Sequence, residues 1–245
     1  SFNILTEFIG VLELTYNLIK INPSIIHAVS TKGIIYGGIL ARLLRIKSLV
    51  ISYAGMGYLF TGNTDSKLKV FQFIFILLQK FILKHKNLRV IIQNNDDKKF
   101  LINHNIVQKK YIVFIKGSGV NLKKFAFSPI KQAEKIVLFP SRLLRNKGVI
   151  EFLEASKILS KKYPDWRFVL AGSIDYVHPT SISLEDINNF IKIKNIEWVG
   201  HQTNILKLYK KSSIVCLPSY REGMPKSLIE AAAVGRPVVT TNAVG

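Results

Sequence analysis

The chain has 245 residues, and its 35 Lys and Arg against 15 Asp and Glu give a formal net charge of +20. Hydrophobic residues make up 48% of the chain and charged residues 20%, a balance that excludes general disorder. A single cysteine, Cys216, excludes a disulfide framework and indicates a reducing compartment.

The first half alternates between strand-like and helical patterns. A helical pattern opens the chain at 3–21. Strand-like apolar runs follow at 24–29, 48–53, 89–94 and 111–116, with helical patterns between them at 33–46, about 66–86 and 95–105. We expect the run at 24–29 to be a buried strand. The alternation predicts a parallel sheet with helices on both faces.

The second half repeats this rhythm after an irregular stretch. Residues 117–135 contain two glycines and a proline without a clear period. Strands are then expected at 136–141, 167–172, 196–200, 213–219 and 237–241, with helices at about 148–162, 184–192, 203–211 and 225–234. The sequence thus predicts two α/β domains, 1–122 and 135–245, joined by a linker at 123–134. Both domains are expected to be truncated, because the first opens in a helix and the second stops after a strand.

One helical segment of the first half, 67–86, is unusually apolar. Its uncharged run from Val70 to Gln79 is too short to span a bilayer, and lysines stand at both of its ends. Two interpretations stay open. The segment is either a buried crossover helix or an interfacial helix that rests on an anionic membrane surface.

The stretch "REGMPKSLIEAAAVGRP", residues 221–237, places Glu222 and Glu230 eight residues apart at a strand-to-helix junction. Pro225 suits the first turn of a helix and Gly235 suits its end. The carboxyl end of a parallel strand beside a helix N-terminus favours a phosphate, and a carboxylate can accept two hydrogen bonds from a ribose diol. The junction suits a sugar nucleotide, although two ordinary surface glutamates on an exposed helix would give the same spacing.

Four segments of the second half follow one another in the order in which a known family has them: "FPSRLLRNKGVIEFLEA", "VLAGS", "IEWVGHQTNILKLYKKSSIVCLP" and "PSYREGMPKSLIEAAAVGRPVVTTNAVG". Together they resemble glycosyltransferase family 4 over most of residues 112–245. The family consists of retaining enzymes of the GT-B fold, in which two Rossmann-like, doubly wound domains face a cleft. In the first half, "PSIIHAVSTKGIIYGGILARLLRI" and "QNNDDKKFL" are similar to the subgroup that builds bacterial capsule, O-antigen and lipid-linked oligosaccharides.

The resemblance implies roles for particular residues. Arg142 and Lys147 would clamp the donor diphosphate, and Glu222 would contact the transferred sugar; these three are the expected catalytic residues. The expected donor-binding residues are Gly223, Met224, Pro225, Ser227, Leu228 and Glu230. Fixed cations beside a leaving diphosphate would lower the barrier, which agrees with these roles. A solvated basic loop is the alternative explanation of Arg142 and Lys147.

The acceptor side is expected at the carboxyl edge of the first sheet. His27, taken as the end of its strand, is a candidate there, although such a histidine is often only structural. The other expected acceptor-side residues are Gly55, Gly57 and Asn94, with Asn95 nearby, whereas His201 is expected near the nucleotide base. Many relatives carry a histidine in the loop at 53–63, and this chain does not. No metal site is expected, because the D-x-D spacing is absent.

The implied reaction moves a hexose or N-acetylhexosamine from a nucleotide-diphosphate sugar, with UDP expected, to a polyprenyl-diphosphate-linked sugar. The nucleotide sugar is a co-substrate, and no cofactor is expected. The expected location is the cytoplasm, at the inner face of the plasma membrane. Alternatives are a GT-B nucleotide-sugar 2-epimerase and an inactive fragment that only binds sugar nucleotide. A nucleic-acid partner is not expected, because the lysines are dispersed.

Overall fold

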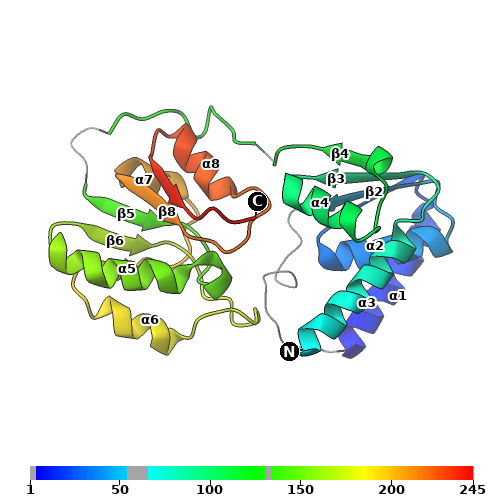
Figure 1. Ribbon diagram of the computed structural model, residues 1–245, viewed down its shortest axis with the longest axis horizontal. Coiled ribbons are helices and arrows are strands. Elements are labelled where there is room, and N and C mark those ends of the chain that lie inside the picture. Colours follow the sequence, from blue (N-terminus) through cyan, green and yellow to red (C-terminus); the bar gives the residue numbers. More distant parts are fainter. Residues whose placement is uncertain (1–3, 54–65, 118, 131–133, 245) are drawn as a thin grey trace. The chain divides into compact units, whose positions relative to one another are not determined.

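The computed structural model describes residues 4–53, 66–117, 119–130 and 134–244. The chain divides into two compact units, one within Ser1–Gly117 and the other within Ser118–Val244. Each unit has its own parallel sheet (Figure 1). Each also has its own buried apolar cluster. The segment at 123–134 belongs to the second unit, where Ser128 N donates a hydrogen bond to Val234 O over 3.1 Å.

The first unit has a four-stranded sheet in the order β1-β2-β3-β4. Its strands are β1 (Ile25–Val29), β2 (Ser48–Tyr53), β3 (Leu88–Ile92) and β4 (Ile112–Phe114). Its helices are α1 (Ile4–Ile21), α2 (Thr31–Leu43), α3 (Ser66–Ile82), α4 (Asn95–Asn103) and the short 3₁₀ turn η2 (Lys109–Tyr111). The four strands and the four α-helices agree with the predicted elements except at their ends, whereas the turn η2 was not predicted.

The strand order of the first sheet runs in one direction, so right-handed crossovers place their helices on one face (Figure 1). On that face Leu49 and Ile51 are fully buried. On the other face Ile25 is 60% exposed and Val29 is 47% exposed. For the described residues, the prediction of helices on both faces and of a buried first strand is therefore wrong. The apolar composition of β1 did not distinguish a central strand from an edge strand.

The second unit has a five-stranded sheet in the order β7-β6-β5-β8-β9. Its strands are β5 (Ile136–Phe139), β6 (Arg167–Leu170), β7 (Ile196–Trp198), β8 (Ile214–Leu217) and β9 (Val238–Thr240). Its helices are η3 (Arg145–Lys147), α5 (Val149–Lys162), α6 (Leu184–Ile191), α7 (Ile205–Lys211) and α8 (Lys226–Ala233). Because the strand order reverses at β5, this sheet is doubly wound, as predicted.

Two glycines bring the loops at the carboxyl edge of the second sheet together. A Cβ atom on Gly172, after β6, would lie 1.8 Å from Ser141 O, after β5. A Cβ atom on Gly148, where φ is +75°, would lie 2.0 Å from Pro218 O, after β8. Only a residue without a side chain allows these approaches. The loops after β5, β6 and β8 therefore pack backbone against backbone.

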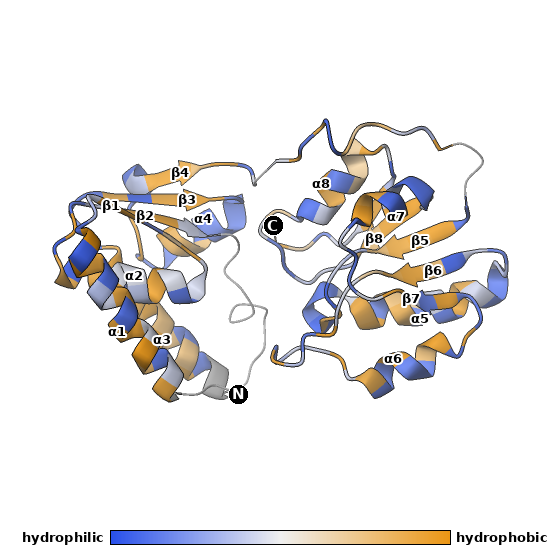
Figure 2. Cartoon of the chain, turned by 180° about the vertical axis from the view of Figure 1, so that it is seen from behind, coloured by the Kyte–Doolittle hydropathy of each residue, from blue (hydrophilic) through white to orange (hydrophobic). Residues whose placement is uncertain are grey.

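Helices α1 and α3 expose many large apolar side chains. Figure 2 shows that much of both helices consists of hydrophobic residues. The exposed side chains on α1 are Leu5, Phe8, Ile9, Leu12, Tyr16, Ile19 and Ile21, and those on α3 are Val70, Phe71, Phe73, Ile74, Leu77 and Phe81. Helix α3 is therefore only partly buried, through side chains such as Phe75 and Ile82. None of the helices in the described part of the chain combines the length and apolar character needed to cross a membrane.

Candidate functional site

A pocket of about 210 Å³ lies at the carboxyl edge of the second sheet, where the strand order reverses. Its walls come from the loops after β5, β6 and β7 and from helices α7 and α8, and they include Ser141, Arg142, His201, Tyr209, Ser227 and Glu230. Open α/β sheets bind ligands at this position. Four of the residues predicted from the sequence line this one pocket, although they lie far apart in the chain: Arg142, His201, Ser227 and Glu230.

Arg142 follows β5 and forms an ion pair in which its Nη1 lies 2.8 Å from Asp175 Oδ2. Burial acts to raise the pKa of Asp175, but the Arg142 guanidinium and the Val177 N–H outweigh it and hold that pKa below its usual value. The Arg142 side chain remains 53% exposed, so an anion can compete with Asp175 for it. The sequence reasoning missed Asp175, and its position in the loop after β6 was the available signal.

Lys147 and Glu222 contact each other directly, although 75 residues separate them. Lys147 Nζ lies 2.6 Å from Glu222 Oε1, and Ser219 Oγ donates a 2.7 Å hydrogen bond to the same oxygen. Turn η3 positions the lysine, and the loop after β8 positions the carboxylate and the serine. Their pairing places a cation and a carboxylate together at the carboxyl edge of the sheet. Ser219 was missed, since its only signal was its position at the end of a strand.

Glu230 stands in the second turn of α8 with its side chain 12% exposed. The Tyr209 hydroxyl forms a hydrogen bond with it, and Lys226 Nζ lies 3.8 Å from its Oε1. Burial raises the pKa of Glu230, although Lys226, Lys124 and Tyr209 act in the opposite direction. Burial also raises the pKa of Tyr209, which therefore stays protonated and can donate to the carboxylate. The sequence did not single out Tyr209, because a buried aromatic residue in a helix is usually part of the hydrophobic core.

The start of α8 differs slightly from the prediction. The helix begins at Lys226, and Pro225 is its N-cap without a side-chain cap. Ser227 lines the pocket, whereas Leu228 is buried and its N–H donates to Pro225 O over 3.0 Å. An anion at this helix start would therefore have to share or replace the bond made by Leu228. Gly223 and Met224 lie in the loop just before, with Gly223 buried and Met224 half-buried.

The structure describes two of the expected acceptor-side residues, His27 and Asn94, and each has local hydrogen-bond partners. His27 lies in the middle of β1 rather than at its end, a correction to the prediction, and its Nε2 lies 2.7 Å from Ser52 Oγ. Asn94 caps α4, because its Oδ1 accepts from Asp97 N over 2.8 Å and its Nδ2 donates to Asp97 Oδ2 over 2.9 Å. Gly55 and Gly57 lie outside the described residues.

The chemistry of the pocket suits a ligand with both charged and hydroxyl groups. The Arg142 guanidinium and the N-terminus of α8 favour an anion, while the Glu230 carboxylate favours hydroxyl donors. Within the described ranges, no group of three His, Cys, Asp or Glu side chains is placed to hold a metal ion.

Two curated bacterial proteins match nearly the whole chain. N,N'-diacetylbacillosaminyl-diphospho-undecaprenol alpha-1,3-N-acetylgalactosaminyltransferase of Campylobacter jejuni is 30% identical over 100% of this chain and 65% of its own length. UDP-Gal:alpha-D-GlcNAc-diphosphoundecaprenol alpha-1,3-galactosyltransferase of Escherichia coli is 26% identical over 99% of this chain and 64% of its own length. The chain thus spans just under two thirds of the length of these relatives.

Two solved structures share the fold of this chain at low sequence identity. HepE from Anabaena, solved in complex with UDP, has a TM-score of 0.74 at 18% identity, over 96% of this chain and 64% of its own. Sucrose-phosphate synthase from Thermosynechococcus elongatus also has a TM-score of 0.74, at 21% identity, over 96% of this chain and 60% of its own. Both likenesses support the GT-B fold.

Family models match both units. The model described as glycosyl transferase 4-like matches residues 3–97. The model described as glycosyl transferases group 1 matches residues 120–245, which is more than half of the chain and contains the whole 210 Å³ pocket. The chain therefore belongs to the group 1 glycosyl transferase family.

Proposed function

We propose that this chain transfers a hexose or N-acetylhexosamine from a UDP-sugar to a sugar carried on a polyprenyl diphosphate, with retention at the anomeric carbon. The observation that carries the proposal is the convergence of Arg142, Ser227 and Glu230 on one pocket at the carboxyl edge of the second sheet. The relatives support it, since the names of both describe transfer to a sugar on diphosphoundecaprenol and one name specifies UDP-Gal.

When the donor occupies the pocket, its own groups would replace the contacts that the pocket side chains make with one another. Its diphosphate would replace Asp175 at the Arg142 guanidinium and would lie at the N-terminus of α8. Its ribose hydroxyls would donate to Glu230, whose carboxylate the Tyr209 hydroxyl holds in place.

Catalysis would rest on stabilising the leaving group. The bond between the sugar C1 and the diphosphate oxygen breaks while the acceptor hydroxyl oxygen bonds to C1 on the same face. The acceptor proton passes to the leaving phosphate oxygen. Arg142 and Lys147 would stabilise the charge that develops on the diphosphate, and Glu222, held by Lys147 and Ser219, would contact the transferred sugar.

The reaction would take place at the anionic inner face of the plasma membrane, where a polyprenyl carrier resides. Helix α3 supports this location, because most of its exposed aromatic and aliphatic side chains, from Val70 to Leu77, lie between Lys69 and Lys80. An amphipathic helix of this kind buries its apolar side chains at the lipid boundary and keeps its lysines among the headgroups.

The test is nucleotide release from a panel of UDP- and GDP-sugars, with a polyprenyl-diphosphate-linked sugar as the acceptor. We expect release from a UDP-sugar that depends on the acceptor, and a product whose anomeric configuration by NMR matches that of the donor. Release without any acceptor, together with an epimerised sugar, would instead favour the 2-epimerase. No release with any donor would contradict the proposal.

Two variants test the site assignment. Glu230→Ala should raise the donor KM by about 10- to 100-fold, because it removes hydrogen bonds to a charged group. Arg142→Ala should lower kcat by about 100-fold, because it removes a fixed cation beside the leaving group. Arg145→Ala is the matched control, since Arg145 pairs with Asp186 over 3.3 Å and its side chain is 57% exposed. Wild-type kinetics in both site variants would show that these residues are wrongly assigned.

A further inference from the structure

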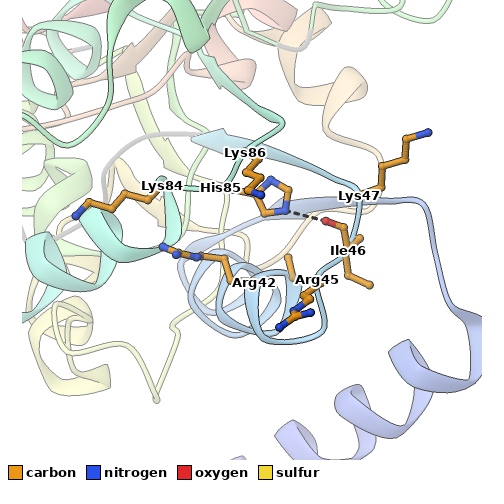
Figure 3. Close-up of a pocket in the computed structure, with 8 residues that line it drawn as sticks. Arg42, Arg45, Ile46, Lys47, Lys84, His85 and Lys86 are labelled. Atoms are coloured by element: carbon orange, nitrogen blue, oxygen red, sulfur yellow. Dashed lines mark hydrogen bonds between the residues drawn. The ribbon is translucent and has the colours of Figure 1, made fainter.

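The first unit contains a strongly basic pocket that the proposed transfer reaction does not use. It has a volume of about 570 Å³ and lies where α2 and α3 end and where β2 and β3 begin. Its charged walls are formed by Arg42, Arg45, Lys47, Lys84, His85 and Lys86 (Figure 3). This is the amino edge of the first sheet, opposite the carboxyl edge at which α/β sheets bind substrates.

Among the residues that the structure describes, these cations have no carboxylate beside them. Residues 1–117 contain 16 Lys and Arg but only five Asp and Glu, and none of the described pocket-lining residues is acidic. Within the described residues, Arg45, Lys47, Lys84 and Lys86 make no ion pair with a carboxylate. Attraction to helix C-termini explains basic residues at the ends of α2 and α3. It does not explain Lys47, which immediately precedes β2, or Lys86, which lies two residues before β3. An anionic ligand would relieve the repulsion among them.

Two contacts hold the backbone at the base of the pocket in place, and we call this base the floor. His85 Nε2 donates a 2.8 Å hydrogen bond to Ile46 O, which ties the turn after α3 to the turn after α2 (Figure 3). The Arg42 guanidinium donates to Phe81 O and lies over the Phe81 ring, 4.2 Å from its centroid. Lys47 and Lys84 extend on opposite sides of this floor (Figure 3). Their flexible stems can bring the ammonium groups to a bound anion.

Arg45 occupies a backbone position that suits glycine or asparagine. It follows α2 in the left-handed region, at φ 55°, and the bonds Arg45 N to Arg42 O and Ile46 N to Ala41 O complete a Schellman motif. At the corresponding ends of α1 and α4 the chain places Asn22 and Asn105 in this conformation. Because arginine is less suited to this backbone conformation than glycine or asparagine, we infer that the Arg45 side chain has a function at the end of α2.

We propose that this basic pocket binds a phosphate group, carried either by an anionic lipid headgroup or by a free phosphate compound. Guanidinium and ammonium groups that make no ion pair with a carboxylate among the described residues match the charge and the hydrogen-bonding capacity of phosphate oxygens. The pocket would act apart from the donor site, because all of its lining residues belong to the first unit.

The test compares the purified wild-type chain with the double variant Lys84→Gln/Lys86→Gln. Both side chains are exposed, so the variant should fold, and an unchanged melting temperature would verify this. One arm measures co-sedimentation with phosphatidylcholine vesicles that contain or lack phosphatidylglycerol. The other arm measures binding of inorganic phosphate by calorimetry. The matched control is Lys161→Gln/Lys162→Gln, which removes two exposed lysines at the end of α5.

We expect the pocket variant, and not the control, to lose about 30-fold in affinity for the phosphatidylglycerol vesicles if the source is a lipid headgroup. A loss confined to inorganic phosphate would identify a free phosphate compound as the source. Equal losses in the pocket variant and the control would overturn the proposal, because total charge alone would then account for the binding. No loss in either arm would overturn it as well, because the pocket lysines would then contribute nothing.

Arg45→Gly gives a second, independent test. Glycine accepts the left-handed backbone, so the melting temperature should rise while affinity for the responsive phosphate source falls by about 5-fold. Unchanged affinity in a stabilised variant would contradict the assignment of Arg45 to this pocket.

Discussion

Glu230 is a carboxylate that the fold holds in a partly desolvated place. Its side chain is mostly buried between the start of α8 and Tyr209, and burial raises its pKa. A raised folded-state pKa in an acid means that the charged form is less favourable in the folded protein than in the unfolded chain. The folded state therefore loses stability through this group at neutral pH and regains it as the pH falls through the raised value.

Glu230→Gln should accordingly raise the free energy of unfolding at pH 7, and this gain should vanish as the pH falls below 4.5, the ordinary value for a glutamate. Affinity for UDP should fall by about 10-fold, because a neutral acceptor makes weaker hydrogen bonds than a carboxylate. Urea unfolding at several pH values and a UDP titration measure the two effects. The control is Glu154→Gln at an exposed position on α5. A variant that is less stable than the wild type at pH 7 would contradict this account.

The sequence identified the candidate residues that stand within a recognisable motif. It missed the residues that contact these candidates from other parts of the chain. Arg142, Lys147, Glu222 and Glu230 stand in recognisable segments, and the structure brings them to one sheet edge. Asp175, Ser219 and Tyr209 contact them across long sequence separations. Nothing in the local pattern distinguishes such a partner from an ordinary loop polar residue or a core aromatic.

At the scale of the elements, the strands and helices of both units could be predicted, but their exposure could not. The run at 66–86 is apolar on most sides, so periodicity did not decide between a buried helix and an interfacial one. The structure shows that the helix is neither wholly buried nor wholly exposed, since Phe73 is 61% exposed whereas Phe75 is 7% exposed. Contact of its exposed side chains with a membrane stays a prediction. The uncovered face of the first sheet escaped prediction for the same reason, since composition does not reveal on which side a helix packs.

These neighbouring phenylalanines give a paired prediction. Phe73→Gln should weaken binding to phosphatidylglycerol vesicles by about 10-fold and leave the melting temperature unchanged, because the exposed ring would contact only lipid. Phe75→Gln should instead lower the free energy of unfolding by about 3 kcal/mol, because it removes a ring from the core. Vesicle co-sedimentation and thermal unfolding separate the two. Unaltered vesicle binding by the Phe73 variant would remove α3 from the proposed membrane contact.

At the scale of the whole molecule, the two units have separate buried clusters. The alternating rhythm of the sequence was sufficient to predict two α/β folds, because each repeat of strand and helix carries its own apolar pattern. It was not sufficient to predict the strand order, which depends on pairings between distant segments. The one-way order of the first sheet and the reversed order of the second became visible only in the structure.

Because the described residues that line the 210 Å³ pocket all belong to the second unit, residues 118–245 should fold alone and should bind UDP within about threefold of the whole chain. Near-ultraviolet circular dichroism would establish folding of the fragment, and calorimetry would give both affinities. A folded fragment that binds UDP more than about tenfold more weakly would mean that the first unit supplies part of the nucleotide site.

The contacts made by Gly148 and Gly172 also bear on how this protein can change over evolution. Surface loops are ordinarily the parts of a domain that accept substitutions most freely. Here two loop positions leave no space for any side chain, since even a single added carbon would overlap a neighbouring carbonyl oxygen. Mutational tolerance should therefore be lowest at these loop glycines, while many exposed helix positions accept change. Among related proteins, the backbone around the donor pocket should therefore stay the same, and substitutions should occur only at the edge of the pocket.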